Sequence, residues 1–220
     1  MKNLDIRQIH ALCFDVDGTL SDTDDLYVER FLPFFRFFRD PLRAARRFVM
    51  WAESPGNFLM SIPDRLGFDD EIWRLYDWLN RRYPRPLRHF RLIPGVHEML
   101  AQLASRYPMA IISARDERST RAFLDHFGLT PFFQVIVTAI TAEHTKPYPD
   151  PIFFAAQAMG VQPEHCLMIG DTTVDIRAGR RANAQTVGVL CGFGEQTELE
   201  RCGAHLIVQQ TPDILNVLRP

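Results

Sequence analysis

Two pairs of aspartates stand directly after strand-like apolar runs of this 220-residue chain. Asp15 and Asp17 flank one residue at the end of "ALCFDVDG", and Asp171 and Asp175 follow "CLMIG". The spacing of the second pair places both carboxylates on one side of a beginning helix. In a parallel sheet the carboxyl ends of the two runs meet at one edge, so we expect the four carboxylates to cluster. Such a cluster needs a cation, and hard oxygen ligands favour Mg²⁺.

Three further positions are expected at the same edge. Ser113 ends the apolar run "MAIIS", and Lys146 follows a third run in "EHTKPYPDP". The chain has 23 arginines but only two lysines, and the other is Lys2 near the N-terminus. Gly18 permits a tight turn in which backbone N–H groups can approach an anion. The crevice would therefore combine carboxylates, a hydroxyl group and an ammonium group.

The elements that position these side chains are predicted by apolar runs alternating with helical patterns. Strands are expected at 11–16, 109–113, 133–138, 166–170, 186–190 and 205–208. Continuous apolar runs of this length are typical of a parallel sheet that is covered on both faces. We predict an α/β fold with a doubly wound, Rossmann-like parallel sheet.

Helices are predicted between the strands. An apolar stripe with helical spacing is formed by Val96, Met99, Leu100 and Leu103. A second helix is expected to begin at Pro151, with Asp150 as its N-cap and Gly160 as its stop signal.

Residues 23–91 have a different composition. They contain no strand-like run and no lysine, but 13 of the 23 arginines and two amphipathic helical patterns. We predict an all-α cap domain at 23–91, inserted into a catalytic core formed by 1–22 and 92–220. A helical stripe of arginines is expected to be a solvated face, or to favour a substrate with a second anionic group if it faces the crevice. Its members are Arg36, Arg39, Arg43, Arg46 and Arg47.

The bulk composition excludes several classes of protein. A net charge of −2 gives no basic field for a nucleic acid polymer. No stretch approaches the roughly 20 apolar residues of a membrane span, and the N-terminus has no signal-peptide pattern. The four cysteines lack metal-ligand spacing, and Cys13 and Cys166 are expected to be buried in strands. We expect a cytoplasmic protein, either a monomer or a homodimer.

The motifs together resemble those of the haloacid dehalogenase-like (HAD) superfamily, specifically its phosphoglycolate phosphatase-like group with a helical cap. The matching stretches are "DVDGTL" at 15–20, Ser113 in "AIIS", Lys146 in "TKPYPDP" and "GDTTVDIRAG" at 170–179. They occur in the family's order. With smaller similarities such as "GFG" at 192–194, they cover the chain outside the predicted cap.

The resemblance implies a catalytic role for three residues. Asp15 would be the nucleophile that forms an aspartyl-phosphate, and Asp17 would protonate the leaving oxygen and then deprotonate water. Lys146 would lie between the Asp15 carboxylate and the phosphoryl group. A compact ammonium group can contact both, whereas the wide planar fork of an arginine fits less well in a space shared with Mg²⁺.

The resemblance also implies the metal and phosphate contacts. Mg²⁺ would be held by the Asp15 carboxylate, the Asp17 backbone carbonyl and Asp171. Asp175 would support the metal's waters or orient the lysine, which completes the metal set of Asp15, Asp17, Asp171 and Asp175. The phosphoryl oxygens would be bound by Ser113 and by the turn at Gly18. The predicted activity is Mg²⁺-dependent hydrolysis of a small phosphate monoester, as in phosphoglycolate phosphatases.

Other functions of the superfamily are distinguished from a phosphatase by the presence or absence of single residues. Haloacid dehalogenases lack the second aspartate, which is present here as Asp17. Phosphonoacetaldehyde hydrolases use a cap lysine, and 23–91 has none. A phosphosugar mutase stays as an alternative, although the cap's only histidine, His89, lies near its end. The other alternative is a non-catalytic phosphate-binding module, against which the completeness of the site argues. Arg115, two residues after Ser113, is expected to be a solvated loop residue, and the alternative is that it reaches an anionic group of the substrate.

Overall fold

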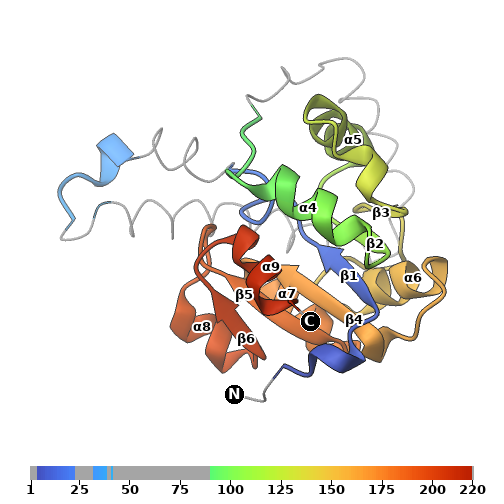
Figure 1. Cartoon of the computed structure of the whole chain (residues 1–220). Coiled ribbons are helices and arrows are strands. Elements are labelled where there is room, and N and C mark those ends of the chain that lie inside the picture. The colour runs from blue at the N-terminus through green and yellow to red at the C-terminus, as the bar shows by residue number, and fades with distance from the viewer. Residues whose placement is uncertain (1–3, 23–31, 39–40, 42–89, 220) are drawn as a thin grey trace, which may run out of the picture. The chain divides into compact units, whose positions relative to one another are not determined.

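The computed structural model describes residues 4–22, 32–38, 41 and 90–219. The chain divides into two compact units, formed by Met1–Asp24 with Arg91–Pro220 and by Asp25–Phe90. The fold described here is that of the first unit (Figure 1). The predicted all-α cap and its arginine stripe fall almost entirely outside the described residues and stay predictions. Within that segment the described part includes a short helical stretch at 32–35.

Six parallel strands form one sheet in the order β3-β2-β1-β4-β5-β6. The strands are β1 (Ala11–Phe14), β2 (Met109–Ile112), β3 (Val135–Val137), β4 (Cys166–Gly170), β5 (Gln185–Val189) and β6 (Leu206–Val208). Each overlaps one of the predicted apolar runs, so the doubly wound parallel sheet is confirmed. Every residue of β1, β2, β4 and β5 is buried, whereas the edge strands β3 and β6 are only partly so.

Helices cover both faces of this sheet. The α-helices of the first unit are α4 (Val96–Ala104), α5 (Glu117–His126), α6 (Asp150–Ala158), α7 (Thr173–Arg181), α8 (Gln196–Arg201) and α9 (Ile214–Val217). Cys13 of β1 packs in one cluster with Ile152 of α6 and Ala178 of α7, which places these two helices on one face. α4 contacts α9, and Figure 1 shows both on the other side of the strands. The predicted stripe of α4 is fully buried.

The order in which the strands are added to the sheet reverses between the two central strands, β1 and β4. β1 is followed by β2 and β3 on one side, whereas β4 is followed by β5 and β6 on the other. In open α/β sheets a crevice forms at such a switch point, outside the carboxyl ends of the strands. Asp15 follows β1 and Asp171 follows β4, so the fold brings the two acidic motifs to this point.

The chain leaves and re-enters the first unit at adjacent positions. The Asp22 N–H donates to the Arg91 carbonyl at 2.9 Å, and Ser21 forms an antiparallel bridge with Leu92. The chain therefore leaves the first unit after Asp22 and re-enters it at Arg91 without interrupting the sheet.

The predicted cap of α6 was wrong. Pro149 is the N-cap and Asp150 is the first helical residue. The Asp150 carboxylate makes no capping hydrogen bond, since the helix begins one residue earlier than predicted, and it accepts a hydrogen bond from the His144 side chain. The C-terminal end agrees with the sequence, since Gly160 adopts a φ of 70° directly after the C-cap. Among the described residues no helix is long and apolar enough to cross a membrane.

Candidate active site

A buried lysine lies at the centre of the candidate site. The Lys146 Nζ atom donates to Asp15 Oδ1 at 2.6 Å and to Asp175 Oδ1 at 2.7 Å. The side chain of Lys146 is only 4% exposed. The structure thus brings together three predicted residues from three segments: the end of β1, the loop before α6 and the first turn of α7.

The electrostatics of this group follow from its burial. Burial alone would lower the pKa of Lys146, but the charges of Asp15 and Asp175 outweigh it and raise that pKa above its ordinary value. Lys146 is therefore a permanent cation. Burial raises the pKa of Asp15 from 3.8 to about 7, with repulsion from Asp175 and Asp17 adding to the effect and Lys146 opposing it. One ammonium group does not balance the surrounding carboxylates.

Asp175 positions the lysine. Its Oδ2 atom accepts a hydrogen bond from the Thr172 N–H at 3.0 Å, which is the contribution of Asp175 to the capping box of α7. The same oxygen also accepts from the Thr172 hydroxyl at 2.6 Å. Its Oδ1 atom accepts from Lys146. A Cβ atom on Gly170 would lie 2.3 Å from the Asp175 carboxyl carbon, so glycine is required at the end of β4. Of the two roles expected for Asp175, this geometry matches orientation of Lys146.

Asp171 is held by the "GFG" loop. Its Oδ2 atom accepts from the Phe193 N–H at 2.8 Å, and its Oδ1 atom accepts from the Thr19 hydroxyl at 3.4 Å. Cβ atoms on Gly192 and Gly194 would lie 2.2 Å from Asp171 Oδ2 and 1.8 Å from its carbonyl oxygen. The two glycines therefore let the loop close over a fully buried carboxylate. The sequence contained this signal only as a short family similarity.

The predicted phosphate contacts are placed at the same edge. The Ser113 hydroxyl oxygen accepts the Arg115 N–H at 3.1 Å, so its proton points elsewhere. Gly18 adopts a φ of 70°, as the predicted turn requires. Its own N–H, however, donates to the Ser21 carbonyl at 2.9 Å. Gly18 thus contributes the shape of the turn rather than a donor.

The expectation for Arg115 was wrong. Its side chain is 7% exposed and forms a two-pronged ion pair with Asp17. Nε donates to Asp17 Oδ2 at 2.6 Å, and Nη2 donates to Asp17 Oδ1. It lies three residues beyond the end of β2, beside the carboxylate that follows the neighbouring strand β1, and this spatial neighbour is not visible in the local sequence.

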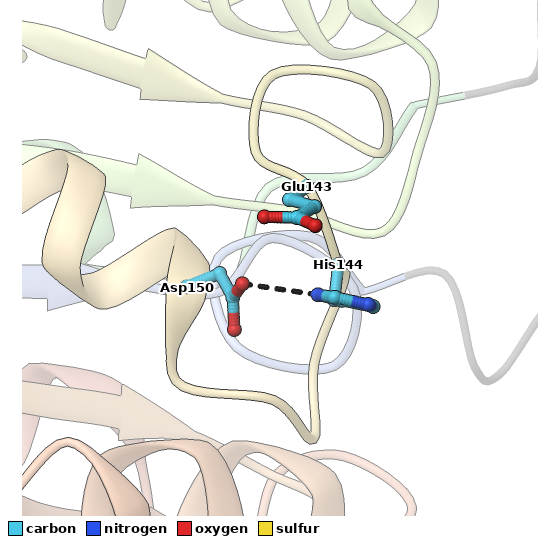
Figure 2. Close-up of side chains that lie close together, drawn as sticks. All are labelled: Glu143, His144 and Asp150. Carbon is cyan, nitrogen blue, oxygen red and sulfur yellow. Dashed lines mark hydrogen bonds and ion pairs between the residues drawn. The ribbon is translucent and has the colours of Figure 1, made fainter.

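A second acidic group lies on the loop that carries Lys146. Figure 2 shows the His144 ring directed at Asp150, with Glu143 to one side. The His144 Nδ1 atom and Asp150 Oδ1 are 3.0 Å apart. This hydrogen bond ties the loop before Lys146 to the start of α6, which fixes the segment from which the lysine projects.

The donor set at the switch point fits a divalent cation. One carboxylate oxygen each from Asp15, Asp171 and Asp175 lies within 4.8 Å of the others, and all three residues are buried. Three carboxylates and one ammonium group leave a formal charge of −2. Oxygen donors alone suit Mg²⁺ better than a soft metal. Both oxygens of Asp175 accept short hydrogen bonds, from Lys146 at 2.7 Å and from the Thr172 hydroxyl at 2.6 Å, whereas the bond from Thr19 to Asp171 Oδ1 is long, at 3.4 Å. Asp15 and Asp171 are therefore better suited to direct ligation than Asp175.

The sheet order and the acidic switch point together define a doubly wound α/β enzyme. The chain belongs to the haloacid dehalogenase-like hydrolase family, whose model matches residues 12–189. The family resemblance inferred from the motifs is therefore confirmed, as is the prediction that the chain is a hydrolase.

Curated and solved relatives agree with this family. A pyrophosphatase PpaX from Oceanobacillus iheyensis is 28% identical over 214 residues, covering 96% of this chain and 97% of its own. A phosphoglycolate phosphatase from Nitrosococcus oceani is 26% identical over 231 residues, covering 97% and 98%. The crystal structure of a hydrolase from Pseudomonas syringae has a TM-score of 0.69 at 28% identity, covering 95% and 97%.

We predict that Asp15→Asn stabilises the metal-free protein at pH 8 but not at pH 5. A folded-state pKa of about 7, above the ordinary 3.8, means that the folded protein holds this proton more tightly than the unfolded chain. The resulting stability is complete below about pH 4 and is lost as the pH rises through 7, by an amount on the order of a few kcal/mol. Asparagine carries no charge and escapes that loss. The test is the difference in melting temperature between the variant and the wild type, measured in a chelator at both pH values. A difference that is the same at pH 5 and pH 8 would contradict the prediction.

We predict that Gly194→Ala destabilises the protein by about 3 kcal/mol or more, because the new methyl group must displace the Asp171 backbone. The matched control is Gly160→Ala. A Cβ atom there meets nothing within 4 Å, and only the positive φ of Gly160 costs about 1 kcal/mol. Urea unfolding of both variants provides the comparison. Equal losses would show that the close approach of the loop is unimportant.

Proposed function

We propose that the protein is a Mg²⁺-dependent phosphatase that hydrolyses a small phosphate monoester through an aspartyl-phosphate on Asp15. The observation that carries the proposal is the buried Lys146 ammonium group hydrogen-bonded to Asp15 and Asp175 at the switch point of the sheet. A cation at this place neutralises the nucleophile's carboxylate and the approaching phosphoryl oxygens together. Phosphoryl transfer depends mainly on such positioning and charge stabilisation.

In the first step, an Asp15 oxygen attacks phosphorus and the bond from phosphorus to the ester oxygen breaks. Asp17 gives its proton to the departing oxygen, so that an alcohol leaves. In the second step, Asp17 takes a proton from water as that water attacks phosphorus. Inorganic phosphate is released, and the Asp15 carboxylate is regenerated.

Several groups hold the phosphoryl oxygens and the metal in this proposal. Ser113 donates its hydroxyl proton, since its oxygen already accepts from the Arg115 N–H. Lys146 contributes its charge. Mg²⁺ would be held by the carboxylates of Asp15 and Asp171 and the backbone carbonyl of Asp17, and it would supply charge neutralisation at the transferred group.

The substrate is proposed from the chemistry of the curated relatives. One is named a phosphoglycolate phosphatase and another a pyrophosphatase. Both names describe a phosphoryl group attached to a second anionic group, a carboxylate or another phosphate. We therefore propose a small substrate with two anionic groups, with phosphoglycolate first and pyrophosphate as the second candidate.

We expect Asp15→Asn to abolish turnover, by at least about 10³-fold, because no covalent intermediate can form. The measurement is phosphate release from a panel of esters, with and without Mg²⁺, beside this variant. The panel includes phosphoglycolate, pyrophosphate, sugar phosphates, nucleoside monophosphates and an aryl phosphate. Activity of the variant near that of the wild type would rule out the covalent mechanism.

We expect Lys146→Arg to lose most activity although the charge is kept, on the order of 100-fold or more in kcat. A guanidinium group cannot replace a compact ammonium group that donates to Asp15 and Asp175 in a fully enclosed space. Steady-state kinetics with the best ester of the panel tests this. Arg181→Lys is the reverse exchange at an exposed side chain and serves as the control. Equal rates for Lys146→Arg and wild type would refute the proposed fit.

A further inference from the structure

Arg115 and Asp17 form an ion pair whose two members differ in exposure. The side chain of Arg115 is 7% exposed, whereas that of Asp17 is 35% exposed. The guanidinium group uses its Nε and Nη2 atoms, one on each carboxylate oxygen of Asp17. A two-pronged contact of this kind fixes the plane of a carboxylate as well as its distance. The buried arginine is thus the fixed member, and the partly exposed aspartate is the member that faces the site.

Among the residues that the structure describes, Asp17 is the one side chain that forms an ion pair with Arg115. Its remaining nitrogen, Nη1, is buried and has no hydrogen-bond partner among the described residues. Its guanidinium carbon lies 5.7 Å from the centre of the Phe123 ring, which packs on the group without accepting a strong hydrogen bond. A buried cation with a single ionic partner is costly unless that partner is kept. The position of Arg115 is therefore explained by Asp17 alone.

The same residue also touches the phosphate side of the site through its backbone. The Arg115 N–H donates to the Ser113 hydroxyl oxygen, and the Arg115 carbonyl accepts from Ala139 at 3.0 Å. These contacts fix the backbone from which the long side chain reaches Asp17. The loop after β2 thereby sets the position of a side chain that follows β1.

We propose that Arg115 is the positioning residue of Asp17, holding its carboxyl group in the orientation needed for both proton transfers. The inference rests on the proposed function, in which Asp17 protonates the leaving oxygen and then deprotonates water. When Asp17 is protonated, the carboxyl oxygen that carries the proton loses its hydrogen bond from Arg115. The hydrogen bond from Arg115 to the second carboxyl oxygen keeps the side chain of Asp17 in place. Once the proton has passed to the leaving oxygen, Asp17 is a carboxylate again and accepts both hydrogen bonds from Arg115. It can then take a proton from the attacking water.

This role predicts a dependence on the leaving group. An alkyl phosphate needs a proton on its departing oxygen, whereas 4-nitrophenolate leaves without one. We expect Arg115→Met to lower kcat/KM for the alkyl ester on the order of 100-fold, and for 4-nitrophenyl phosphate by less than about threefold. KM for the alkyl ester should change little, whereas kcat and KM for 4-nitrophenyl phosphate should fall together, because the slowed water step then limits turnover of that ester. Since the water step still needs Asp17, the variant should also release a rapid burst of one 4-nitrophenolate per site.

Matched variants separate positioning from charge or folding. Arg121→Met removes an exposed arginine of α5, the helix that follows the loop of Arg115. This arginine pairs with Glu117, and its loss should leave kcat/KM unchanged for both esters. Arg115→Lys keeps the charge but not the two-pronged contact, so it should not restore alkyl ester turnover. An equal loss with both esters, or full rescue by lysine, would overturn the proposal. An equal loss would instead indicate that Arg115 binds the phosphoryl group or supports the fold.

A second measurement does not depend on activity. Thermal melting of Arg115→Met, Asp17→Asn and the double variant forms a double-mutant cycle. We expect the double variant to melt no lower than the less stable single variant, because either single change already removes the ion pair between the two side chains. Strictly additive losses would overturn the positioning role. If the wild type hydrolyses neither ester, the proposed function fails, and the cycle still decides whether Arg115 holds Asp17.

Discussion

The site depends on one buried cation. Lys146 is enclosed by protein and is stable there only because Asp15 and Asp175 accept its hydrogen bonds. Each of these carboxylates is in turn fixed elsewhere, Asp15 through its backbone N–H to the Ile169 carbonyl and Asp175 through the capping box of α7. The ammonium group of Lys146 therefore links the end of β1, which carries Asp15, to the first turn of α7, which carries Asp175. This linkage explains why lysine persists at a single interior position in a chain whose other basic side chains are almost all arginine.

Burial encloses the hydrogen bonds of Lys146, but it also destabilises the charged form of Asp15. The pKa of Asp15, raised to about 7, reflects an imbalance: burial of its carboxylate costs more than the attraction of Lys146 returns, and the neighbouring carboxylates add to that cost. Removing the imbalance would stabilise the fold and remove the nucleophile. The structure thus keeps a local electrostatic strain, which a divalent cation or a bound proton relieves. Strain of this kind is common where a fold stores charge for catalysis.

Much of the architecture could be predicted because it is written in local patterns. The six apolar runs gave the strands, and the burial of the α4 stripe follows from helical periodicity. The site residues Asp15, Ser113, Lys146 and Asp171 were predicted from their places at strand ends. What was missed depends on partners distant in sequence. Arg115 resembles a loop arginine until β1 and β2 are placed side by side, and Asp150 resembles a helix cap until His144 is known to compete for it.

The hydrogen bond between Asp22 and Arg91 has an evolutionary consequence. The two ends of the intervening segment meet, the parts of the chain that carry Asp15, Lys146 and Asp171 all belong to the first unit, and loop closure costs little more for a long segment than for a short one. The segment could be exchanged, lengthened or rewritten while Asp15, Lys146 and Asp171 keep their places. Insertions and substitutions in that stretch can therefore accumulate over evolutionary time without displacing the parts of the chain that carry these three side chains.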